Sequence, residues 1–171
     1  MLDVLRKQND EEGFTLIELM VVVLIIGILL AIAVPTFLKA QNNAKTKAAT
    51  SNVRTSLSSM KTVYTDVQSY DSASITTSVL KAAEPSLGWQ TGASTAPDQI
   101  SYAFGSATAP GDTVGLAVLS KLGDCFYIKD SVNPTTGGTT FGRVNAAAAG
   151  SCTGTNALTG ATSASPSAAN W

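Results

Sequence analysis

The amino-acid sequence predicts an α+β fold, in which one long N-terminal α-helix packs on a small antiparallel β-sheet head. Three observations support this prediction. An apolar stretch lies near the N-terminus, a 3.6-residue repeat of apolar side chains follows it, and short strand-like segments come later, separated by Gly, Pro and Asp. The length of 171 residues suits one domain with an appended segment.

The first element is the apolar stretch. Residues 19–34 form an unbroken run of 16 apolar residues, and Glu18 is the only charged residue in the range 14–38. A helix needs about 20 residues to cross a hydrocarbon core roughly 30 Å thick, and this stretch is long enough. We therefore expect a transmembrane helix over residues 14–38, preceded by a charged leader over residues 1–13.

Two ordinary explanations of this stretch account for only part of it. A cleaved secretory signal would use the match Ala31-Ile32-Ala33, but such signals begin with a positive region, whereas residues 1–13 hold two basic and four acidic side chains. A plain single-pass anchor leaves Glu18 unexplained, because a carboxylate inside a membrane helix costs about 2.5–3.5 kcal/mol on insertion scales.

The second element is an amphipathic continuation of the same helix over residues 39–69. Its apolar face is predicted to pack on the head, and the opposite face is basic. The basic face allows two interpretations, a patch for DNA or anionic lipid and a solvated surface, and the wide spacing of its charges favours the second. The apolar face is formed by Ala49, Val53, Leu57, Met60, Tyr64 and Val67, and the basic one by Lys45, Lys47, Arg54 and Lys61.

The head is expected over residues 70–152. A short helix begins after Ser72 or Ser74, either of which can cap it, and ends at Ala83 before Pro85. Strands of an antiparallel meander are expected over residues 100–104, 113–119, 124–129 and 139–144. Residues 153–171, rich in Ser, Thr, Ala and Gly, are expected to form a loosely ordered tail in which Trp171 is the one candidate for docking.

Composition argues against catalysis. The chain has no histidine, 13% charged residues and a formal charge of −1, so it lacks the commonest general base and the basic excess of a generic nucleic-acid binder. We find no nucleophile elbow, phosphate loop or paired-carboxylate motif, and we expect no enzyme activity, no cofactor and no metal. Asp124, Lys129 and Asp130 are interpreted as surface charges.

The segment Gly13-Phe14-Thr15-Leu16-Ile17-Glu18-Leu19-Met20, followed by VVVLIIGILLAIAVP, closely resembles the class III signal of type IV pilins and type II secretion pseudopilins. The resemblance covers roughly residues 8–40. It implies that a prepilin peptidase cuts between Gly13 and Phe14 on the cytoplasmic side and methylates the new amine of Phe14. One departure is the acidic sequence Asp10-Glu11-Glu12, where family leaders often have basic residues.

The resemblance also implies roles for residues within the apolar helix. Glu18 of one subunit would neutralise the Phe14 amine of a neighbour during assembly, although pairing with the amine of its own chain remains open. Gly27 and Pro35 weaken a helix by themselves and would ordinarily give a mild kink. In pilins with these two residues at matching positions, the helix between them can lose order in the filament.

Two cysteines, Cys125 and Cys152, lie in the predicted head. Their spacing excludes a Cys-x-x-Cys redox motif, and an exported location makes a disulfide the default. The resemblance agrees, because a disulfide-bounded C-terminal loop is frequent in type IV pilins.

As a whole, the resemblance implies a major-type structural pilin that is held in the cytoplasmic membrane with its head outside and then polymerised into an extracellular filament. Adhesion, motility or DNA uptake would be outputs of that filament. The implied partners are other copies of the chain, a prepilin peptidase, a platform membrane protein and, indirectly, an assembly ATPase; a nucleic-acid partner has only weak support.

The alternatives are a type II secretion pseudopilin, a minor pilin and a membrane-tethered binding module. Pseudopilin heads commonly bind calcium through clustered acids, and the acids here are scattered, which favours a pilin.

Overall fold

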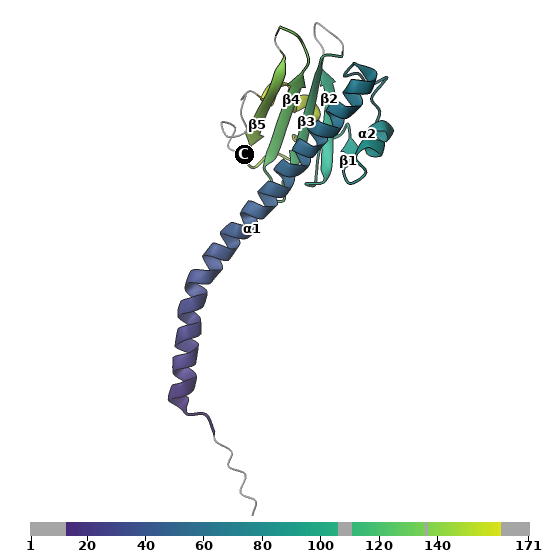
Figure 1. The fold of residues 1–171 in the computed structure, drawn as a ribbon. Coiled ribbons are helices and arrows are strands. Elements are labelled where there is room, and N and C mark those ends of the chain that lie inside the picture. The colour runs from purple at the N-terminus through teal and green to yellow at the C-terminus, as the bar shows by residue number, and fades with distance from the viewer. Residues whose placement is uncertain (1–12, 106–110, 136, 162–171) are drawn as a thin grey trace, which may run out of the picture. The chain divides into compact units, whose positions relative to one another are not determined.

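A computed structural model describes residues 13–105, 111–135 and 137–161 (Figure 1). The chain divides into two compact units, Met1–Gln41 and Asn42–Trp171. Three helices are described, α1 (Leu16–Val67), α2 (Thr77–Ala83) and α3 (Gly154–Gly160). The five described strands are β1 (Gly88–Gln90), β2 (Gln99–Gly105), β3 (Thr113–Leu119), β4 (Cys125–Ser131) and β5 (Gly138–Val144).

The described part of the first unit is the N-terminal part of α1. Its side chains from Phe14 to Gln41 are exposed all round the helix, including every large apolar one. The most apolar 18-residue window of α1 has a mean hydropathy of 3.1 and none of it is buried. By length and composition, this helix could cross a membrane, in agreement with the expected transmembrane segment.

The second unit is built on one five-stranded sheet with strand order β1-β2-β3-β4-β5. Strands β2 to β5 pair antiparallel, as expected, in a continuous meander. The sheet as a whole is mixed rather than antiparallel, because β1 pairs with β2 in parallel. Gly88 is the partner of Gln99, and the next two residues of each strand pair in the same register. Sequence analysis missed β1 because three residues are too few to show an alternating pattern.

One face of the sheet is covered by the C-terminal part of α1, which crosses the strands in Figure 1. Ala49, Val53 and Met60 are completely buried, as the predicted apolar face requires. Leu57, Tyr64 and Val67 of the same face are partly buried and pack against the same cluster. The sheet contributes Ile100, Tyr102, Val114, Leu116, Val118, Phe126 and Ile128 to this cluster.

The other face of the sheet is covered by α3, which sequence analysis had placed in a loosely ordered tail. That expectation is wrong for residues 154–160. Thr153 caps the helix by accepting a hydrogen bond from the Asn156 N–H at 3.1 Å, and Ala157 is completely buried in a second cluster with Ala117 and Tyr127. Residues 162–171, with Trp171, lie outside the described residues.

Helix α2 begins later than expected and has a different cap. Thr76, rather than Ser72 or Ser74, accepts the Val79 N–H at 3.5 Å. The reason is Asp71, whose carboxylate accepts the backbone N–H groups of Ala73 and Ser74 and holds this segment in a turn. The helix ends at Ala83, as expected from Pro85.

Candidate functional site

The candidate site begins where α1 begins, with Thr15 and Glu18. The Thr15 hydroxyl accepts the Glu18 N–H at 3.3 Å, and the Glu18 carboxylate accepts the Thr15 N–H at 3.2 Å and the Thr15 hydroxyl at 2.9 Å. This reciprocal arrangement is a capping box, which satisfies backbone donors that would otherwise have no partner in the first turn. The capping box was not among the expected features, although the pattern Thr-x-x-Glu before an apolar run indicates it.

Glu18 therefore has a partner within its own chain, and this partner is Thr15. Gly13 and Phe14 precede the capping box, and the Phe14 side chain is 86% exposed. The roles expected for Gly13 and Phe14 in cleavage and methylation, and for Glu18 in assembly, stay predictions.

The apolar surface that follows is large and uncovered. Each large apolar residue from Leu16 to Leu38 is at least 47% exposed. Isolated apolar side chains on a surface are ordinary, but a contiguous apolar patch of this kind marks contact with a membrane or another protein. The surface is thus a candidate for burial in lipid or against other chains.

Gly27 and Pro35 both lie inside α1, which is helical through both positions. Proline at position 35 has no N–H to donate to the Ala31 carbonyl. Beside it, the Thr36 hydroxyl donates to the carbonyls of Ile32 at 3.1 Å and Ala33 at 2.8 Å. Local loss of helix between Gly27 and Pro35 is therefore not a property of the single chain described here and stays a prediction for the filament.

In the head, Cys125 and Cys152 form the expected disulfide. It joins β4 to the segment just before α3, and the Cys152 carbonyl also accepts the Ser94 N–H at 2.8 Å. The two cysteines are 27 residues apart in the sequence, and β5 lies in the loop that the bond closes. It therefore holds the covering helix α3 to the sheet.

Two carboxylates interpreted as surface charges are instead buried and paired. Asp130 has a side chain that is 4% exposed, and it accepts the Tyr70 hydroxyl at 2.9 Å and the Lys61 ammonium at 3.0 Å. Asp124 binds the Arg143 guanidinium at 2.7 Å. Burial, with the charge and hydrogen bond of Asp130, raises the pKa of Tyr70 well above its ordinary value.

The alternation of side chains along β4 could have indicated that Asp130 is buried. Successive side chains of a strand point to opposite faces, so Asp130 shares the face of Phe126 and Ile128, which belongs to the core. Its partners could not be found in this way, because Lys61 and Tyr70 are about 60–70 residues away in the sequence.

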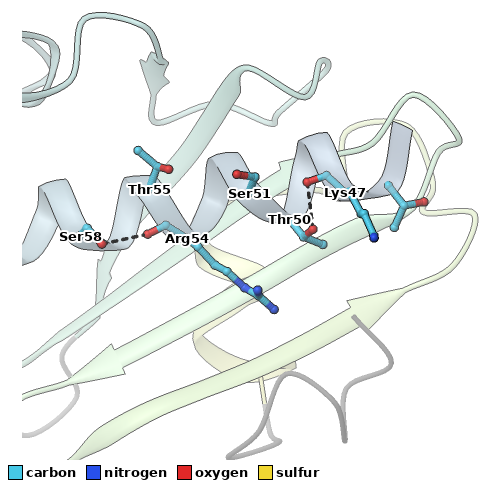
Figure 2. A pocket seen from close by; sticks show the side chains of 7 residues that line it. Lys47, Thr50, Ser51, Arg54, Thr55 and Ser58 are labelled. Atoms are coloured by element: carbon cyan, nitrogen blue, oxygen red, sulfur yellow. Dashed lines mark hydrogen bonds between the residues drawn. The ribbon is translucent and has the colours of Figure 1, made fainter. Parts of the chain in front are cut away.

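A polar groove of about 510 Å³ runs along the exposed side of α1 within the head. Figure 2 shows Lys47 and Arg54 extending from the helix in the same direction, with hydroxyl side chains between them. The groove is lined by Thr46, Lys47, Thr50, Ser51, Arg54, Thr55 and Ser58. Among the described residues, no group of three or more His, Cys, Asp or Glu side chains could hold a metal ion.

Comparison with known proteins finds similarity in the N-terminal segment. Residues 8–34 match the model of the prokaryotic N-terminal methylation motif. Over 65 residues, the chain is 43% identical to the type IV major pilin protein PilA of Myxococcus xanthus (strain DK1622). This alignment covers 38% of the chain and 30% of the length of that relative. No solved structure matches the chain.

The relative is a type IV major pilin, and the motif that residues 8–34 match is one of N-terminal methylation. The motif lies on a long apolar helix, and that helix continues into a head with a five-stranded sheet and a disulfide. In these features the chain is similar to type IV pilins.

Proposed function

We propose that the chain is a major-type subunit of a type IV pilus, a structural protein whose copies polymerise into a surface filament. The observation that supports this most directly is the uncovered apolar helix, residues 16–38, most of which lies within the methylation motif of residues 8–34. An apolar surface of this extent needs lipid before assembly and other copies of the chain afterwards. The filament would serve adhesion, motility or DNA uptake.

In this proposal the chain has five functional segments. Residues 1–13 are a leader removed by prepilin peptidase between Gly13 and Phe14, and residues 14–38 anchor the chain in the cytoplasmic membrane with the head outside. Residues 39–69 carry the head on the same helix. Residues 70–152 form the globular head with its disulfide-bounded loop, and residues 153–171 are the C-terminal segment rich in Ser, Thr, Ala and Gly. A platform membrane protein and an assembly ATPase would move subunits from the membrane into the filament.

The new Phe14 amine, once methylated, would carry a positive charge four residues from Glu18. A cation and an anion inside an apolar filament core each need a partner, because burial of an isolated charge is costly. We propose that Glu18 of one subunit exchanges its Thr15 partner for the Phe14 amine of a neighbour. The segment between Gly27 and Pro35 would lose helical order in the filament and allow it to extend.

The experiment that tests the proposal is mass spectrometry of filaments sheared from cells. A methylated Phe14 terminus on an abundant filament subunit is the expected result. A low-abundance subunit would favour a minor pilin, and recovery only from a secretion complex would favour a pseudopilin. An uncleaved chain that is absent from the sheared material would contradict the proposal and favour a membrane-tethered binding module.

A further inference from the structure

The groove on α1 is the positive part of a head whose charges are segregated. Residues 42–65 hold four basic and no acidic side chains, whereas residues 66–161 hold seven acidic and four basic ones. Lys47 and Arg54 lie seven residues apart, or about 10 Å along a helix. Both are exposed and line the groove together with hydroxyl side chains. The groove therefore offers two cations and several hydrogen-bonding groups in a row.

The negative complement lies at the start of β1. The Leu87 N–H donates to the Glu84 carbonyl at 3.4 Å, and the next N–H, of Gly88, donates to the Asp98 carbonyl at 2.8 Å. The backbones of Glu84 and Asp98 are thus neighbours, and we call this pair of residues the acidic corner. The Glu84 carboxylate also accepts the Ser86 hydroxyl at 2.7 Å. Asp98 is exposed and Glu84 is partly exposed.

The groove and the acidic corner of one chain face different ways. Asn52 of α1 points to the corner, because its side-chain amide donates to the Pro97 carbonyl at 2.8 Å. Arg54 is two residues further on, and side chains two residues apart on an α-helix project about 200° apart. A groove and a corner on different sides of one head can meet only between copies. Such a head-to-tail contact does not form a closed pair, and it produces an open polymer where the rotation between copies does not close a ring.

We propose that the groove along residues 46–58 receives the acidic corner of a second copy, and that this charged contact between heads repeats along the filament. The inference rests on the proposed function, which supplies the high local concentration of copies. Two exposed ion pairs contribute little to the free energy of association of two isolated chains. In a filament the chains are already held together, so each contact forms at a high effective concentration and the contributions of successive contacts accumulate.

The charges favour a second copy over DNA or anionic lipid as the occupant. Removal of the leader deletes two basic and four acidic residues, so that the side-chain balance changes from 11 − 12 = −1 to 9 − 8 = +1. A chain so close to neutrality lacks the basic excess of a polyanion binder. Affinity for nucleic acid rises with the number of phosphates that basic side chains neutralise. A groove with two cations neutralises few phosphates, so its affinity for nucleic acid would be low at physiological salt.

Charge reversal in the full-length chain tests the contact. The variant with Lys47→Glu and Arg54→Glu should lower the yield of sheared filaments by about tenfold or more, because each attraction becomes a repulsion at every repeat. Adding Glu84→Lys and Asp98→Lys should restore the yield. The control variant Lys121→Glu, compared with Arg54→Glu alone, has the same change in charge at an exposed position outside both the groove and the acidic corner and should assemble normally.

Carbodiimide cross-linking of wild-type filaments identifies the partner directly, because it joins an amine to a carboxylate in direct contact. Lys47 should be joined to Glu84 or Asp98 in the dimer band. Normal assembly of the groove variant, or cross-links of Lys47 only within one copy, would overturn the inference. Normal assembly with loss of binding to DNA or to anionic vesicles would assign the groove to a polyanion instead. If the wild type forms no filaments, the proposed function fails. The inference is then tested by cross-linking the detergent-solubilised chain, where Lys47 should again be joined to Glu84 or Asp98 of a second copy.

Discussion

The two parts of α1 belong to one helix but follow different physical rules. In the range 16–38 large apolar residues occupy every side of the helix and all are exposed. In the range 42–67 they recur on one face, and the residues on that face are buried against the sheet. A one-sided apolar face can be satisfied by the chain's own head, whereas an all-round one needs lipid or other molecules.

The head, in contrast, covers its buried clusters with its own helices. Its sheet is covered on one face by α1 and on the other by α3, and each face has its own buried cluster. A disulfide and the ion pairs of Asp124 and Asp130 add long-range connections. Stability of the head should therefore be independent of protein concentration, while association through residues 16–38 should depend on it. Changes placed in one region should leave the other unaffected.

The largest effect on the head is expected from removing the disulfide. Replacing both Cys125 and Cys152 by Ser should lower the free energy of unfolding by about 3.5 kcal/mol, because the 27-residue separation is no longer constrained in the unfolded chain. Urea unfolding of the detergent-solubilised protein, followed by tryptophan fluorescence, measures this loss. Reduction of the wild type serves as the control and should give the same midpoint, and an unchanged midpoint in the double variant would contradict the expectation.

A matched pair of methionines on α1 compares the two regions directly. Met60 is completely buried, whereas Met20 is 63% exposed. Met60→Ala should cost the head about 2–5 kcal/mol through lost contacts and a cavity, with about 3 kcal/mol as the central value. Met20→Ala should leave head unfolding unchanged and should weaken only association between chains. Equal effects of the two variants on head unfolding would show that the regions are not independent.

Local patterns in the sequence predicted most of the head but could not predict the contacts that complete it. The boundaries of β3 follow from a short, mostly apolar run between turn residues, and the buried face of α1 follows from its periodicity. Helix α3 was missed because its residues, GTNALTG, are typical of a loop. Its packing depends on backbone proximity: a side chain at Gly115 would collide with the Gly154 carbonyl. Only tertiary structure reveals why these glycines suit a helix on a sheet.

The candidate site shows the same limit. The positions of Gly13, Phe14 and Glu18 were identified from a short local pattern, and the capping box at Thr15 was available from the same residues. The contact of Asp130 with Lys61 and Tyr70 was not available, because it joins three distant segments. Pairing of this kind is set by the fold, and no property of the neighbouring residues indicates it.

A smaller effect, confined to the head, is expected from Tyr70→Phe. The variant removes a buried hydrogen bond to Asp130 and should cost about 1.5–3 kcal/mol at neutral pH. It should also reduce the loss of stability at high pH. Burial raises the pKa of Tyr70, so the folded chain keeps a proton that the unfolded chain loses above pH of about 10.

The contribution of Tyr70 is therefore fully present below pH 10 and declines as the pH rises above it. Urea midpoints between pH 8 and pH 11 test this dependence. Tyr127, whose pKa burial also raises, should supply a residual slope in the variant. An identical slope in Tyr70→Phe and the wild type would exclude Tyr70 as its source.

The smallest effect on the head, close to zero, is expected from changes at Thr15 and Glu18, yet these changes separate two roles of Glu18. Thr15→Ala removes the capping hydroxyl and keeps the charge, and it should cost the first turn of α1 about 1 kcal/mol. Glu18→Gln keeps a side chain that can complete a capping box but removes the charge.

If Glu18 pairs with the Phe14 amine of a neighbour, Glu18→Gln should be inserted and processed normally but give few filaments, and Thr15→Ala should assemble well. The yield of sheared filaments, compared with the amount of processed chain in the membrane, measures this difference. The reverse ranking of the two variants would assign Glu18 to the helix cap alone.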